Sequence, residues 1–167
     1  MEAFGAIYLD TNIFIMAFEI RSEVSDQLTQ IFDRLDGQPE ACLVTSELTL
    51  SELLVRPIRE NDEQRMEQYE AFIAPSRWLN VLPAARSTLR VAATLRAQNS
   101  NLKLPDAIHI ATALRANCSH ILTNDQGIKA SYSLHLRVKM SDPPITPLTV
   151  IRPDAPTLSS ILQSLAA

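Results

Sequence analysis

The chain has 167 residues, of which 46% are hydrophobic and 20% are charged; these proportions are ordinary for a globular protein with a buried core and exclude a disordered chain. The formal net charge is −4, whereas proteins that bind nucleic acid usually carry an excess of basic residues. A cluster of acids that binds a cation would also give a negative net charge, so the charge alone does not exclude a nucleic-acid substrate. We find no secretory signal and no apolar run long enough to span a membrane, so a cytoplasmic location is expected.

The cysteines and histidines do not form a recognisable metal-binding pattern. Cys42 and Cys118 lie far apart in the sequence, each beside apolar residues, which favours buried free thiols over a disulfide. The histidines, at positions 109, 120 and 135, lack the spacing of a zinc site. We therefore expect no zinc.

The first half of the chain alternates short apolar strands with helical patterns. The expected strands cover residues 7–9, 41–44 and 78–82. The first expected helix covers residues 11–18, and the second is capped by Ser25 and stopped by Gly37. The third is capped by Thr45 or Ser46 and ended by Pro57. The fourth is charged and runs from a capping box of Asn61 and Gln64 to Pro75.

The second half continues this alternation as far as Asp125. A helix over residues 84–98 is expected to face inward with Leu89, Ala92, Ala93 and Leu95 and outward with Arg86, Arg90 and Arg96. A polar loop, a helix over residues 106–116 and a strand at 121–122 follow. Beyond Asp125 we expect strands over residues 134–140 and 148–151, around Pro143, Pro144 and Pro147, and a helix over 158–165.

Short strands that are apolar on both faces and alternate with helices predict an α/β fold. In such a fold a central, mainly parallel sheet is covered by helices on both sides. The length of the chain favours one domain over residues 1–167.

Four acidic residues fall near the ends of these elements. Asp10 and Asp125 directly follow strands, Asp106 opens a helix, and Glu52 lies among leucines. Taken singly, Asp10 and Asp106 suit helix caps and Asp125 suits a turn. Glu52 can be solvated at the edge of its helix. These separate readings do not explain why all four are expected at one edge of the sheet, where ligands of parallel sheets bind.

Four carboxylates at one edge would repel one another unless they shared a divalent cation. Hard oxygen ligands suit Mg²⁺ or Mn²⁺. A site of this kind can bind a phosphodiester and hold a water for in-line attack.

The segments IYLDTNIFI, TSELTLSELLVRP, LPDAIHIATAL and ILTND together resemble the successive motifs of PIN-domain nucleases, and among these the VapC-type toxins of toxin–antitoxin systems. The resemblance covers about residues 5–128 and leaves an extension over about 130–167 unassigned. It implies a three-layer α/β/α PIN-like fold with a metal-dependent endoribonuclease site.

Carried over position by position, the resemblance implies a set of site residues and partners. The metal ligands would be Asp10, Glu52, Asp106 and Asp125, with Mg²⁺ or Mn²⁺ as the cofactor. Their polar supports would be Thr11, Asn12 and Thr123. The resemblance further implies an RNA substrate, a small antitoxin as partner and a homodimer.

Other residues near the motifs are also assigned roles. The candidates for contacting RNA, chosen for nearness in sequence to the acids, are Arg56, Arg59, Lys103 and Lys129. Asn124 is interpreted as a support for its turn. His109, one helical turn after Asp106, is interpreted as a packed or hydrogen-bonded side chain.

Two other functions remain open. A PIN-like module that binds RNA or protein without catalysis would not need all four acids. A phosphatase with an aspartyl nucleophile would need a second Asp where the chain has Asn12. With three glycines and no Gly-x-Ser-x-Gly segment, a glycine-rich phosphate loop and a serine-hydrolase elbow are excluded.

Overall fold

A computed structural model of the chain describes residues 5–35, 43–132 and 147–165. Six strands form one sheet in the order β3-β2-β1-β4-β6-β5. The strands are β1 (Ile7–Leu9), β2 (Leu43–Ser46), β3 (Leu79–Leu82), β4 (His120–Leu122), β5 (Ser131–Tyr132) and β6 (Leu148–Ile151). All neighbours pair in parallel except β5, which runs antiparallel to β6.

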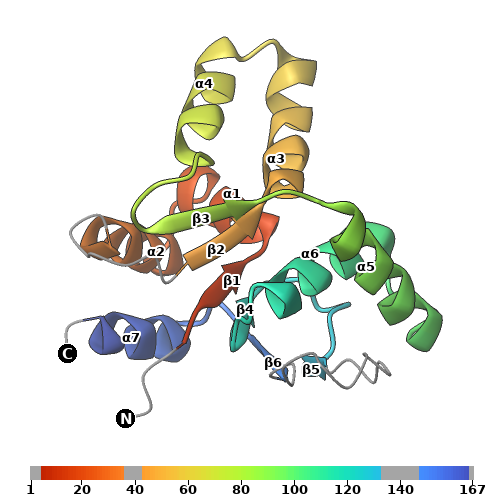
Figure 1. Cartoon of the computed structure of the whole chain (residues 1–167). Coiled ribbons are helices and arrows are strands. Elements are labelled where there is room, and N and C mark those ends of the chain that lie inside the picture. Colours follow the sequence, from red (N-terminus) through yellow and green to blue (C-terminus); the bar gives the residue numbers. More distant parts are fainter. Residues whose placement is uncertain (1–4, 36–42, 133–146, 166–167) are drawn as a thin grey trace.

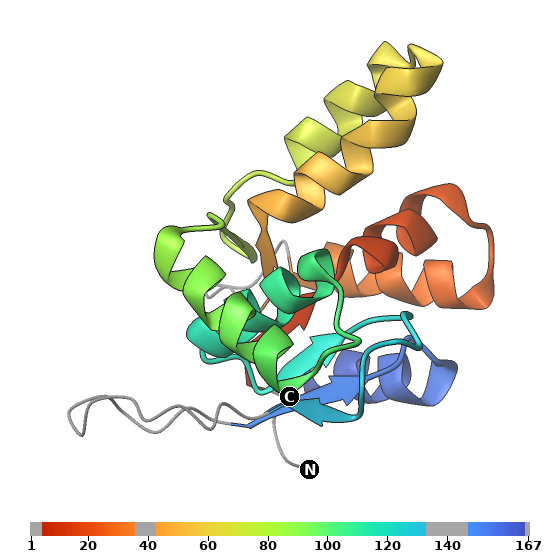
Figure 2. The same cartoon turned by 90° about the vertical axis from the view of Figure 1, so that its right-hand side faces the viewer.

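Helices cover both faces of this sheet. They are α1 (Thr11–Glu19), α2 (Glu23–Leu35), α3 (Glu47–Glu60), α4 (Glu63–Phe72), α5 (Arg86–Gln98), α6 (Leu104–Arg115) and α7 (Ala155–Ser164). In Figure 1, α1, α2 and α7 lie on one side of the sheet and α5 and α6 on the other, while α3 and α4 form a hairpin that projects beyond it. Figure 2 shows the same projection from the side. The predicted three-layer α/β/α architecture with a mainly parallel sheet is confirmed.

The alternation of side chains along β1 explains how three residues can serve two cores. Ile7 and Leu9 pack into the core beneath α1, α2 and α7. Tyr8, which is completely buried, points to the opposite core beneath α5 and α6. Because both faces are covered, the strand contains no charged residue, and the first charged side chain after it, Asp10, stands where the strand ends.

The hairpin of α3 and α4 differs from its prediction at three residues. Pro57 lies inside α3 and is buried, so it does not end the helix. A proline removes one amide donor, and the helix continues to Glu60, where Asn61 adopts the left-handed conformation (φ 54°) as its C-cap. The predicted capping box of Asn61 and Gln64 is therefore wrong: Asp62 caps α4 by accepting the Arg65 N–H at 2.9 Å.

Helix α2 begins before its predicted cap. Ser25 lies within α2 and is buried. Ser22 takes the capping role: its Oγ accepts the Ser25 N–H at 3.2 Å, and the Ser22 N–H donates to Ser25 Oγ at 2.9 Å. This reciprocal pair satisfies two donors at the helix start.

On the other face of the sheet, the buried side of α5 differs from its prediction. The buried face of α5 is Thr88, Ala92 and Leu95, whereas Leu89 is 43% exposed and Ala93 is also exposed. The buried face of α5 is therefore rotated relative to the predicted face, from Leu89 toward Thr88.

Helix α6 starts at Leu104, so Asp106 is its third residue and not its cap. Pro105 is tolerated in the first turn because amides there have no partner within the helix.

The C-terminal region agrees in part with its predictions. Strand β6 matches the expected strand, α7 starts earlier than expected with Asp154 as its cap, and β5 was not foreseen. The predicted strand over residues 134–140, Gly37 and Cys42 lie outside the described residues. Cys118 is a buried free thiol, as predicted, and burial raises its pKa to about 12. Over the described ranges, no helix has the length and apolar character needed to cross a membrane.

Candidate active site

Asp10 is fixed at the carboxyl end of β1 by residues of two neighbouring strand ends. Leu9 pairs with Leu122 of the adjacent strand β4, and the Asp10 N–H donates to the Leu122 carbonyl at 3.1 Å. One carboxylate oxygen of Asp10 caps α1 by accepting the Thr11 N–H at 2.7 Å. The other accepts the Thr123 hydroxyl at 2.6 Å. The capping interpretation of Asp10 is therefore correct, and it accounts for only one of the two oxygens.

Asn12 joins the two strand ends from the first turn of α1. Its amide nitrogen donates to Asp10 Oδ2 at 2.7 Å and to Thr123 Oγ1 at 3.2 Å. Its amide oxygen accepts the backbone N–H of Asn124 at 2.9 Å. The Asn124 side chain is not needed for this contact.

Asp125 forms the turn that follows. Its N–H donates to Thr123 Oγ1 at 3.0 Å, and its Oδ1 accepts the Gly127 N–H at 2.7 Å. The turn interpretation of Asp125 is correct, and the same turn sets its carboxylate beside the end of β4.

Glu52 reaches the same region from the second turn of α3. It accepts a short hydrogen bond from the Thr11 hydroxyl, and its Oε2 lies 3.0 Å from Nε2 of His109 on α6. Partial burial opposes ionisation of Glu52, but the bonds from His109 and Thr11 outweigh it and hold the pKa of Glu52 below its usual value. Glu52 is therefore partnered and is not a freely solvated acid.

His109 links the acids to the core. It is 2% exposed, and its Nε2 also lies 3.7 Å from Asp10 Oδ1. Its Nδ1 lies 2.7 Å from the hydroxyl of Tyr8 on β1. Burial and the nearby Asp10 charge raise the pKa of Tyr8 well above its usual value, so the phenol keeps its proton. We assign the tautomer in which Tyr8 donates to Nδ1 and Nε2–H donates to Glu52.

Asp106 completes the group from the first turn of α6. Its pKa is raised, first by burial and then by the negative charges of Asp125 and Asp10. The positive charge of Lys103 acts in the opposite direction. Asp106 therefore lies close enough to Asp125 and Asp10 for their charges to act on it.

The four acids, named here the acid site, thus lie at one edge of the sheet. As the side chains stand, no three His, Cys, Asp or Glu residues within the described ranges are close enough together to hold a metal ion. The donor set nevertheless fits Mg²⁺ or Mn²⁺ in its chemistry, because its ligands are hard oxygens and their mutual repulsion would be relieved by a cation.

Sequence reasoning placed Tyr8 in the core and His109 as a packed or hydrogen-bonded side chain. That view of His109 is correct, but its contacts with Glu52 and Asp10 were missed. The only signal in the sequence was the helical spacing from Asp106.

The predicted RNA-contacting residues are dispersed. Lys103 acts electrostatically on Asp106, and Lys129 Nζ donates to Asn99 at 3.0 Å. Arg56 is held by Glu19 and Glu60, at 2.9 Å each. Arg59 is exposed near the end of α3.

Comparison with known proteins agrees with this architecture. A toxin–antitoxin complex from Klebsiella pneumoniae contains a chain 26% identical to this one, with a TM-score of 0.51, over 72% of this chain and 87% of its own. VapC20 of Mycobacterium tuberculosis, a toxin that cleaves the sarcin–ricin loop, is 13% identical with a TM-score of 0.55 over 70% and 87%. VapBC2 of Rickettsia felis, bound to a DNA fragment from its promoter, is 18% identical with a TM-score of 0.55 over 72% and 88%.

The last two identities are low enough that those likenesses concern the fold alone. No curated protein matches the chain significantly. Residues 7–132 match the family model of the PIN domain, a span that includes all four acids and all three of their polar supports. The chain therefore belongs to the PIN-domain family.

Proposed function

We propose that the protein is a metal-dependent endoribonuclease that hydrolyses RNA phosphodiester bonds, and that it is the toxin of a toxin–antitoxin pair. The observation that carries the proposal is geometric: Thr123 and Asn12 both donate to one carboxylate oxygen of Asp10, and His109 Nε2 lies 3.0 Å from Glu52 and 3.7 Å from Asp10. The charges of Asp125 and Asp10 also raise the pKa of Asp106, after burial. Carboxylates that repel one another at the carboxyl edge of a parallel sheet destabilise the protein unless they serve a ligand.

In this proposal Asp10, Glu52, Asp106 and Asp125 hold Mg²⁺ or Mn²⁺. When bound, the cation would polarise a water and offset the charge that develops on the phosphodiester. Thr123 and Asn12 keep Asp10 in one orientation, since both donate to the same carboxylate oxygen. Thr11 and His109 do the same for Glu52. These partners limit the orientations that the Asp10 and Glu52 carboxylates can adopt.

The test is cleavage of a pool of structured RNAs with Mg²⁺, Mn²⁺ or EDTA. Asp10→Asn and Asp106→Asn are each expected to abolish cleavage while the circular dichroism spectrum stays that of the wild type. Asp33→Asn, which removes an exposed carboxylate on α2, is the matched control and should cleave normally. A wild type that cleaves nothing with either metal would refute the proposal.

The partner part of the proposal rests on the toxin–antitoxin relatives. A small antitoxin encoded next to the gene for this chain should co-purify with it. The proposed RNA substrate is consistent with the cytoplasmic location expected from the sequence. Expression of the wild type alone should slow growth of a bacterial host, whereas Asp10→Asn should not. The predicted homodimer is tested by light scattering of the purified chain.

A non-catalytic module that binds RNA or protein is the second candidate. The observation that favours it is that, among the described residues, no three possible ligands are already arranged around one point. Normal RNA binding by the two Asn variants, combined with an inactive wild type, would support this alternative.

A further inference from the structure

The positive charges of this acidic chain are concentrated in one segment. Of its fifteen Lys and Arg residues, six lie within residues 71–124, but only one of its nineteen acids does, namely Asp106. This segment contains β3, α5, α6 and β4. The helix layer formed by α5 and α6 is therefore basic, whereas the remainder of the chain is strongly acidic.

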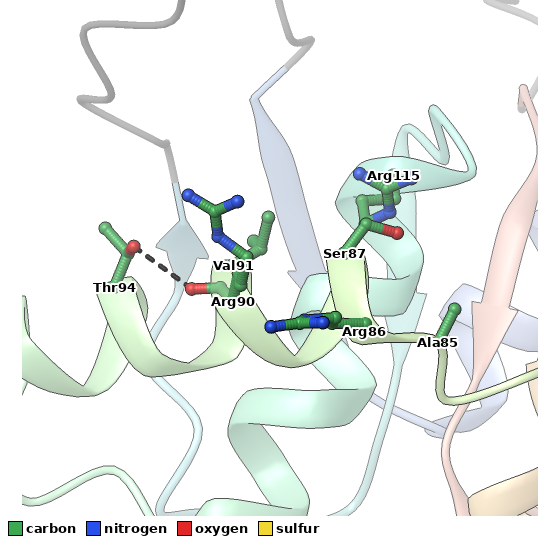
Figure 3. Close-up of a pocket in the computed structure, with 7 residues that line it drawn as sticks. All are labelled: Ala85, Arg86, Ser87, Arg90, Val91, Thr94 and Arg115. Carbon is green, nitrogen blue, oxygen red and sulfur yellow. Dashed lines mark hydrogen bonds between the residues drawn. The ribbon is translucent and has the colours of Figure 1, made fainter.

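Three of these arginines line a pocket of about 660 Å³ on the outer side of that layer. Figure 3 shows Arg86 and Arg90 on α5 and Arg115 at the end of α6. All three are exposed, and none forms an ion pair with a described residue. Ser87 and Thr94 add hydroxyl groups to the lining. We name this feature the arginine pocket.

Further basic residues gather near the far end of α5. Helix α5 is about 20 Å long, and the residues that line the pocket lie mainly in its N-terminal half. At its far end Arg96 donates to the Leu102 carbonyl at 3.1 Å, and Lys129 donates to the C-cap residue Asn99 at 3.0 Å. Lys103, which acts electrostatically on Asp106, is the last member of this basic track.

We propose that the arginine pocket binds backbone phosphates of the RNA whose scissile bond lies at the acid site. The proposal rests on the proposed function and adds a second contact region to it. Unpaired guanidinium groups are suited to phosphates and can stack on bases. An acidic protein segment would also be attracted, but the track that leads to the acid site favours a polymer that reaches both places.

The pocket also compensates for the charge of the whole chain. An acidic protein repels RNA at long range, so phosphate contacts must come from a local basic surface. The arginine pocket is such a surface, and it lies on α5 and α6, whereas Arg56 and Arg59 belong to the α3 hairpin.

The test compares two triple variants for binding a short unstructured RNA in EDTA. The pocket variant is R86Q/R90Q/R115Q. The matched control is R21Q/R34Q/R77Q, which removes three exposed arginines outside the pocket. The pocket variant should bind roughly tenfold or more weakly, and the slope of log K against log salt should decrease in magnitude by about 2 to 3. In the control variant, the loss of affinity and the change in the salt slope should each be less than half as large.

Equal losses in the two variants, no loss in the pocket variant, or a wild type that does not bind the RNA would each overturn the proposal. So would a pocket variant that loses affinity for labelled polyglutamate but not for RNA, since the pocket would then serve an acidic protein. Because binding is measured in EDTA, this result is independent of cleavage. A wild type that cleaves RNA while the pocket variant binds normally refutes only the pocket.

Discussion

At the scale of single residues, the Thr123 hydroxyl is the point where the site is held together. It donates to Asp10, and it accepts from Asn12 and from the Asp125 N–H. Thr123→Val keeps the shape and removes all three bonds, so a buried carboxylate oxygen loses a donor. We expect the free energy of unfolding, measured in urea, to fall by about 1–3 kcal/mol. RNA cleavage should fall by roughly ten- to a hundredfold because Asp10 loses its orientation.

Thr123→Ser separates the hydroxyl from the methyl group. The serine variant retains the three hydrogen bonds, so its cleavage rate should stay close to that of the wild type even if stability decreases slightly. If valine and serine reduce cleavage equally, packing of the methyl group and not hydrogen bonding explains the role of Thr123.

Residues such as Asp10 could be predicted because the signal is local. A carboxylate directly after a buried strand, followed by a helix, is visible in ten residues of sequence. The contacts of His109 could not be predicted, since its partners Tyr8 and Glu52 lie 101 and 57 positions away along the chain. They meet only after α6 has packed over β1 and beside α3.

At the scale of elements, the α3–α4 hairpin depends on Asn61, whose left-handed conformation was not predicted from the sequence. Asn61 ends α3 in the left-handed region with φ 54°, which asparagine and glycine tolerate and β-branched residues do not. We expect Asn61→Val to lower the free energy of unfolding by about 1–2 kcal/mol. Asn61→Gly should leave it within about 0.5 kcal/mol of the wild type.

Urea denaturation of both variants measures this difference. If Asn61→Val lowers the free energy of unfolding no more than Asn61→Gly does, the backbone at position 61 is not held in the left-handed region. The same hairpin shows why element boundaries were harder to predict than elements. Pro57 is a strong local stop signal, but the packing of α3 against α4 and the Asn61 cap extend the helix past it.

At the scale of the whole molecule, parallel pairing explains why three of the four acids, which are distant in sequence, meet. Strands β2, β1 and β4 are neighbours and run in the same direction, so their carboxyl ends share one edge. The residue after β1 is Asp10, α3 after β2 carries Glu52, and the turn after β4 carries Asp125. Short apolar strands alternating with helices were sufficient to predict this arrangement, whereas the pairing of β5 with β6 was not foreseen.

This arrangement predicts that a divalent cation stabilises the whole chain. The folded state gathers charges that the unfolded chain keeps apart, so an ion bound only by the folded state should stabilise it. The gain is about 2.7 kcal/mol when the free ion is at about 100 times its dissociation constant, which raises Tm by roughly 5–10 °C for a chain of this size. Thermal melts in EDTA, Mg²⁺ and Mn²⁺, at equal ionic strength, measure it without any substrate.

The variants used for cleavage give this measurement its controls. Asp10→Asn removes a proposed ligand, so the melting temperature of this variant should respond to the ions much less than that of the wild type. Asp33→Asn should respond fully, because α2 lies on a face of the sheet and not at the acid site. A wild type whose melting temperature is the same in EDTA and in both metals would mean that the acids hold no ion. The non-catalytic module would then be the better account of four carboxylates at one edge.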